Sequence, residues 1–200
     1  MMTGFLATAR RDSPTVEAAF HLATEWCAGH VIDGGPALGH AVRVTTTLGR
    51  HAPGAPVHVI AACLLHDAPD LAPNDEEMAR RITNACGADV LAVITHLHAE
   101  HQVLADPSGV HTSRHLTTLA TVPWLLHAAT ADKIVAFEHV TGLAANTPEA
   151  DAFWASRPAF IRLLPYFHQV QRAGAGHLPP SMSAAYADLL ARRPAPAAQP

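Results

Sequence analysis

Two histidines and two aspartates occur in an order and spacing that could bind a divalent metal ion. His66 and Asp67 follow an apolar run, His40 lies upstream of them and Asp132 lies downstream. Imidazole and carboxylate groups from three separated segments can surround an ion and leave room for water, which a single helical turn cannot do. These donors suit a divalent ion such as Mn²⁺, Fe²⁺, Zn²⁺ or Co²⁺. The sequence therefore predicts a metal-dependent hydrolase.

A further carboxylate follows the central pair and is a candidate for proton transfer. On one helix, His66 and Asp67 would point about 100 degrees apart. Pro69 disfavours helical geometry at the residue before it, so we expect the chain to leave the helix where these ligands occur. Asp70, one turn past His66, would orient or deprotonate the attacking water, and Asp67 is expected to serve catalysis as well as metal binding.

Helices are expected to position all of these residues. Alanine, leucine and valine dominate the chain and β-branched alternation is rare, which predicts an all-α fold. Helix-start and helix-stop residues divide the sequence into segments. The expected helices lie at about residues 14–29, 37–50, 56–67, 74–86, 88–101, 112–121, 124–141, 147–174 and 181–193. The second would carry His40, the buried third would end at the central pair, and the seventh would carry Asp132.

Length and composition indicate one domain with one hydrophobic core. The chain has 200 residues, of which 49% are hydrophobic, and this is ample to fill such a core. We expect a flexible N-terminal segment at residues 1–12, the main helical domain at 13–180, a C-terminal helix at 181–193, and a disordered tail rich in proline and alanine at 194–200.

Composition also excludes several classes of partner. No apolar stretch approaches the ~18 residues of a membrane span, and the first residues lack the zones of a signal peptide, so we expect a cytoplasmic protein. The net charge of −4, with scattered cations, argues against nucleic acid. Cys27, Cys63 and Cys86 show no C-x-x-C spacing and are interpreted as small buried residues. The expected partner is a small phosphate-bearing molecule, and a homo-oligomer stays possible.

The pattern H…HD…D, together with its surroundings, resembles a known enzyme family. Similar blocks occur in the same order at residues 28–44, 60–67, 87–95 and 130–134. They resemble the HD superfamily of metal-dependent phosphohydrolases, in particular its RelA/SpoT-type hydrolase branch and the small metazoan SpoT homologues. The resemblance covers roughly residues 15 to 165.

This resemblance implies a fold, a ligand set and an activity. The fold would be an all-helical HD domain. It would bind one Mn²⁺-type ion through His40, His66, Asp67 and Asp132. The activity typical of the branch is hydrolysis of guanosine tetraphosphate at its 3′-diphosphate.

The chain departs from the branch at positions that serve catalysis or contact the substrate. A Glu-Asp pair after the HD motif, a basic pair before the first histidine, and an Asn and Arg after the last aspartate are replaced here by Asp70 and Leu71, Gly29 and His30, and Ala136 and Glu138. Guanosine tetraphosphate would meet fewer cations, so another nucleotide or phosphate ester is an equally good prediction. The expected substrate contacts are His30, Arg43 and Lys133.

Surplus histidines leave two alternatives open. Six lie between the HD motif and Asp132, at His96, His98, His101, His111, His115 and His127. Oxygenases of the HD superfamily use additional histidines in this region to hold a second iron, so a di-iron oxygenase is the first alternative. The second is a non-catalytic ligand-binding module, which the departures at Leu71, Ala136 and Glu138 favour.

Overall fold

The computed structural model describes residues 4–32, 34–105 and 110–192, except for the side chains of residues 101, 102, 105 and 110. Its helices are α1 (Gly4–Asp12), α2 (Pro14–Trp26), α3 (Ala37–His51), α4 (Val57–Leu64), α5 (Ala68–Leu71), α6 (Asp75–Cys86), α7 (Ala88–His98), α8 (Glu100–Ala105), α9 (Val110–Thr121), α10 (Leu125–Ala145), α11 (Ala150–Ala155), α12 (Pro158–Ala173) and α13 (Pro180–Ala191). The predicted all-α class is confirmed. Two antiparallel strands of two residues each, β1 (Val31–Ile32) and β2 (Gly35–Pro36), were not predicted from the sequence.

Within the stretch at residues 1–12 that was expected to be flexible, the structure has helix α1 (Gly4–Asp12). Helix α1 packs against α2 and α3, and Leu6 is buried in the core. Arg10 donates hydrogen bonds to Glu17 of α2 and lies over the ring of Phe20. Burial of apolar area against two neighbouring helices stabilises a segment too short to be helical alone.

Two of the predicted helix starts have the capping bonds that their sequences indicate. The Ser13 side chain accepts a hydrogen bond from the Val16 amide at the start of α2. The Asn74 side chain accepts one from the Glu77 amide at the start of α6. Each bond satisfies an amide that has no partner within its helix, so these two starts are determined locally.

Two long helices predicted in the sequence are each divided in the structure. The segment expected at 88–101 ends at His98 and continues as α8. The segment expected at 147–174 breaks before Pro158, whereas Pro165 is accommodated inside α12. Proline at the first helical position lacks only an amide that would have no partner there, which explains why Pro158 begins a helix. The predicted tail at 194–200 lies outside the described residues.

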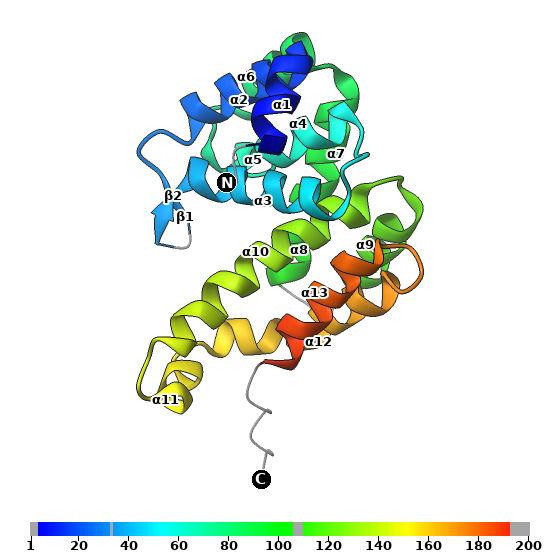
Figure 1. Cartoon of the computed structure of the whole chain (residues 1–200). Helices are drawn as coiled ribbons and strands as arrows, with labels where there is room; N and C mark the ends of the chain where they lie inside the picture. The colour runs from blue at the N-terminus through cyan, green and yellow to red at the C-terminus, as the bar shows by residue number, and fades with distance from the viewer. Residues whose placement is uncertain (1–3, 33, 106–109, 193–200) are drawn as a thin grey trace.

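Helix α10 is the central element of the fold. Figure 1 shows it between the N-terminal helices α1 to α7 and the C-terminal helices α11 to α13. It packs against α3 on one side and α13 on another, while α4 is covered by α2, α3 and α7. Helices α3 and α4 and the middle of α10 therefore meet in the interior. Among the described residues, we find no helix with both the length and the apolar character needed to cross a bilayer.

Candidate metal site

The HD pair lies in a turn between two helices. Helix α4 ends at Leu64, and Leu65 leaves helical geometry with φ −114° and ψ 10°. Asp67 precedes the first residue of α5, and Pro69 lies in the first turn of that helix. The predicted break is therefore present at the ligand pair, although Ala68 itself begins a new helix. Because neither His66 nor Asp67 lies within a continuous helix, both side chains can face the same point.

Four side chains from separate elements converge there. The Nε2 atom of His40 lies 3.2 Å from Oδ1 of Asp132 and 4.0 Å from Oδ2 of Asp67. The Nε2 atom of His66 lies 3.3 Å from Oδ2 of Asp67 and 3.6 Å from Oδ1 of Asp132. Ligand atoms of His40, His66 and Asp67 all lie within 4.8 Å of one another. The structure thus brings together the four residues predicted as ligands.

A backbone hydrogen bond fixes the orientation of His66. Its Nδ1 lies 2.9 Å from the carbonyl oxygen of Cys63 in α4. A carbonyl can only accept, so Nδ1 carries the proton and donates it. In the neutral ring, Nε2 then has a free lone pair directed at the two carboxylates. Histidine ligands in metal sites are held in this way by a bond from the second nitrogen.

Two buried atoms of the cluster have no hydrogen-bond partner among the described residues, which supports a bound ligand. They are Nε2 of His66 and Oδ2 of Asp67, which face each other without hydrogen-bonding geometry. Leaving such atoms buried and unpaired is costly, so native proteins satisfy them with protein groups, water or ions. A divalent cation would satisfy an imidazole nitrogen and a carboxylate oxygen at once, and the donor set therefore fits a metal ion.

The electrostatics of the cluster favour positive charge. Burial alone would lower the pKa of His66, but the carboxylates of Asp67 and Asp132 outweigh it and raise that pKa. Burial alone would raise the pKa of Asp132, yet its hydrogen bond with His40 and the nearby imidazole of His66 hold that pKa well below its ordinary value. Burial also raises the pKa of the Cys63 thiol, so this neighbour stays neutral. The carboxylates of Asp67 and Asp132 therefore favour a positive charge in the site.

A narrow cavity of about 50 Å³ extends inward from the cluster. Its lining includes His66, Asp67, Asp132 and Glu100. This volume holds water but not a nucleotide. The histidines are buried, whereas 17% of the Asp67 side chain and 29% of the Asp132 side chain are exposed. A substrate would therefore reach the carboxylates from the solvent side.

Asp70 lies outside the group of converging ligand atoms. It is on α5, its side chain is 47% exposed, and Oδ2 lies 3.8 Å from Nδ1 of His98 on α7. An accessible carboxylate three residues after Asp67 suits proton transfer better than metal binding. Its catalytic role stays a prediction.

The three residues expected to contact substrate are placed very differently. Lys133 is only 3% exposed, and its ammonium forms an ion pair with Glu100, so it faces a carboxylate and not solvent. Arg43 is partly exposed on α3, one turn after His40. His30 is exposed and lines a separate groove beside Cys27 and the hairpin. Lys133 thus faces the core in this structure, and its contact with a substrate stays a prediction.

Sequence reasoning missed a buried polar cluster next to the site. Glu100 of α8 accepts hydrogen bonds from the hydroxyl of Tyr166 and the ammonium of Lys133, and its Oε1 lies 3.7 Å from Nε2 of His115. All four side chains are buried. The signal available was Lys133, the only lysine of the chain, among the apolar residues expected on the buried side of this helix, where a buried charge requires a partner.

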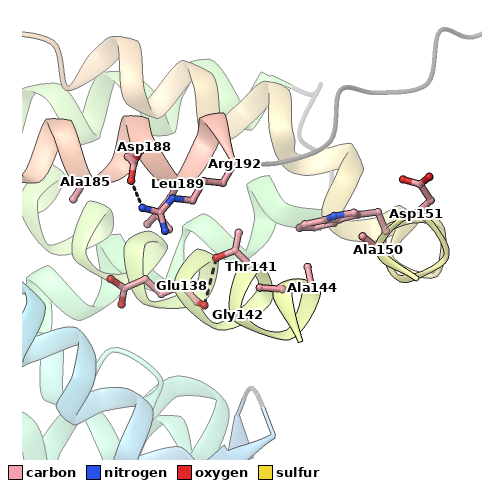
Figure 2. A pocket seen from close by; sticks show the side chains of 12 residues that line it. Glu138, Thr141, Gly142, Ala144, Ala150, Asp151, Ala185, Asp188, Leu189 and Arg192 are labelled. Atoms are coloured by element: carbon pink, nitrogen blue, oxygen red, sulfur yellow. Dashed lines mark hydrogen bonds and ion pairs between the residues drawn. The ribbon is translucent and has the colours of Figure 1, made fainter. Parts of the chain in front are cut away.

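A broader groove of about 630 Å³ lies elsewhere, between α10, α11 and α13. Figure 2 shows Glu138 and Thr141 of α10 facing Asp188 and Arg192 of α13 across it, with Asp188 and Arg192 forming an ion pair. None of the four candidate ligands lines this groove. Glu138, one of the departures from the HD pattern, thus lines this groove and not the cavity beside the four candidate ligands.

The surplus histidines do not form one group. His96, His111 and His115 line a common pocket, His98 faces Asp70, and His127 stacks near Trp124 with ring centroids 4.7 Å apart. The side chain of His101 lies outside the description. Within the described ranges, the candidate site is the one cluster with three or more potential ligands. The geometry therefore gives no specific support to a second iron.

No protein-family model matches this sequence, and no curated protein is significantly similar to it.

Proposed function

We propose that this protein is a metal-dependent phosphohydrolase of the HD type, acting on a nucleotide or another phosphate ester. The observation that carries the proposal is the convergence of His40, His66, Asp67 and Asp132 on one point, with the lone pair of His66 directed inward by its bond to the Cys63 carbonyl. Two imidazoles and two carboxylates are a donor set for Mn²⁺, Fe²⁺, Zn²⁺ or Co²⁺.

The protein side chains have distinct roles in this proposal. His40 and His66 supply neutral nitrogen ligands from the buried side. Asp67 and Asp132 supply charge and face solvent, where substrate would bind. A divalent ion held there would polarise a phosphoryl oxygen and lower the pKa of a water molecule. Asp70, exposed beside His98, accepts the proton of the attacking water.

Hydrolysis of guanosine tetraphosphate is one form of this activity, but the positions of the described cations give no particular support to so highly charged a substrate. Lys133 is committed to Glu100, and His30 lines a groove of its own. Of the expected contacts, Arg43 alone is both partly exposed and within one helical turn of a candidate ligand, on the same face of α3 as His40. A substrate with fewer phosphates agrees better with this supply of positive charge.

The test is metal analysis of the purified full chain, followed by assays on nucleotides and phosphate esters with Mn²⁺. We expect one ion per chain and metal-dependent release of phosphate or pyrophosphate. The D67A variant should retain the fold but lose both. Unchanged turnover by D67A would reject this ligand, and two irons with oxygen-dependent turnover would favour the oxygenase alternative.

A further inference from the structure

We propose that a pocket lined by histidines and an arginine, separate from the candidate metal cluster, binds the phosphate group of a small molecule. The pocket has a volume of about 240 Å³ and is lined by His96, Ala99, His111, Arg114, His115 and Thr118. The phosphohydrolase function is not needed for this inference, because the site requires no metal ion and shares no residue with the four candidate ligands.

The pocket combines one face of α9 with the end of α7. His111, Arg114, His115 and Thr118 occupy positions i, i+3, i+4 and i+7 of α9 and therefore share a face. His96 in the last turn of α7 completes the lining from the opposite side. Three imidazoles and a guanidinium from two helices thus surround one hollow.

The charge of the lining is all of one sign. Among the described residues, no aspartate or glutamate lines the pocket and Arg114 forms no ion pair. An arginine without a carboxylate partner, beside imidazole N–H donors, matches the oxygens of an anion. Donors arriving from two helices suit a tetrahedral phosphate better than a planar carboxylate.

A second observation comes from His115, which is buried at the inner wall. Its Nε2 is buried, has no hydrogen-bond partner among the described residues and faces Oε1 of Glu100 at 3.7 Å. Glu100 is itself held by Lys133 and Tyr166. One nitrogen of the His115 ring therefore lies beside a buried carboxylate that is itself held in place. Side chains that are held in place by neighbouring buried groups are typical of binding sites.

The experiment uses the full chain stripped of metal, so that phosphate cannot bind through an ion. Histidine ring signals are followed by NMR during titration with inorganic phosphate, with chloride holding the ionic strength constant. We expect saturable shifts confined to His96, His111 and His115. The R114Q variant should bind phosphate at least about tenfold more weakly, since it loses the bidentate, permanently charged donor.

Matched variants separate a specific site from general charge. R172Q removes an exposed arginine of α12 and should leave phosphate affinity unchanged. H111Q, at an exposed position of α9, provides a second substitution within the pocket, and thermal melting checks that each variant is folded. Shifts that saturate neither with inorganic phosphate nor with adenosine monophosphate, or equal weakening of binding by R114Q and R172Q, would overturn the proposal.

Two further ligands identify the source of the phosphate. Adenosine monophosphate and adenosine are titrated under the same conditions. Binding of the nucleotide and not of inorganic phosphate assigns the pocket to an esterified phosphate, and equal binding assigns it to the free anion. Binding of adenosine alone as tightly as the nucleotide would contradict phosphate recognition.

Discussion

The imidazole Nε2 of His40 and the carboxylate Oδ1 of Asp132 lie 3.2 Å apart, although 92 residues separate them in the sequence. Packing of α3 against α10 brings them together. The distance is therefore set by the apolar contacts of two long helices and not by local sequence. Since Asp132 is partly exposed, replacing it should alter the site far more than the fold.

The D132N substitution tests the ligand contributed by α10. The amide keeps the shape of the side chain but removes the charge that binds the cation. Changes around a ligand typically cost 10–100-fold in metal affinity, so loss of a direct ligand should cost about 100-fold or more, with comparable loss of turnover. Isothermal titration with Mn²⁺ measures the affinity. D151N on α11 is the control, and equal affinity of D132N and wild type would exclude Asp132 as a ligand.

The D70N substitution separates proton transfer from metal binding. Asp70 lies outside the converging atoms, so D70N should bind Mn²⁺ normally. Loss of a general base should lower kcat by about 10²–10⁴-fold with little change in KM. Steady-state kinetics on the best substrate of the panel provide the measurement. A fall in metal affinity equal to that of D132N would place Asp70 among the ligands.

The local features of this chain could be predicted from the sequence. Ser13 and Asn74 cap helices as expected, and Pro69 accompanies the break that frees His66 and Asp67. Each depends on residues close in sequence, where backbone geometry and capping chemistry decide the outcome. The order of the ligands along the chain was also sufficient to identify which four side chains would meet.

Features that depend on packing could not be predicted in the same way. Leu6 gives no strong signal within its short helix, and only the neighbouring helices make it a core residue. Lys133 directly follows a ligand, yet whether its side chain faces substrate or Glu100 depends on where α8 lies relative to α10. The sequence shows neither the position of α8 nor the approach of Tyr166 from α12, so the buried cluster was missed.

Breaking the buried ion pair of Lys133 and Glu100 should destabilise the protein strongly. The K133M substitution leaves Glu100 buried without its cation and should reduce the free energy of unfolding by about 3 kcal/mol or more. The double variant K133M/E100Q should recover part of this loss, because the uncompensated charge is removed. Urea denaturation of the metal-free proteins measures both. Equal stability of K133M and wild type would contradict the ion pair.

The same pair predicts how stability depends on pH. Burial alone would raise the pKa of Glu100, but the charge of Lys133, the nearby imidazole of His115 and hydrogen bonds from Lys133 and Tyr166 outweigh it and lower that pKa. The unfolded chain, with a pKa of about 4.3, then binds more protons than the folded one below this value. This contribution is fully present above about pH 4.3 and is lost as pH falls through the folded pKa.

The pH effect is measured as a difference between two proteins. Other carboxylates also titrate in acid, so urea denaturation of wild type and E100Q is compared from pH 3.5 to 6, a window set by the ordinary pKa of about 4.3. Wild type should lose more stability than E100Q as the pH falls. Parallel curves over the whole window would show that Glu100 has the same pKa in both states.

The last prediction concerns the packing of α1 against the rest of the domain. Leu6 is buried against the core, so L6A should reduce the free energy of unfolding by about 2 kcal/mol, at the lower end of the range for Leu→Ala because the helix lies at the chain end. T8A, at an exposed position of the same helix, should change it by less than about 0.5 kcal/mol. Chemical denaturation provides both values. If L6A and T8A were equally stable, α1 would not be part of the cooperative unit, which would agree with the flexible N-terminal segment expected at residues 1–12.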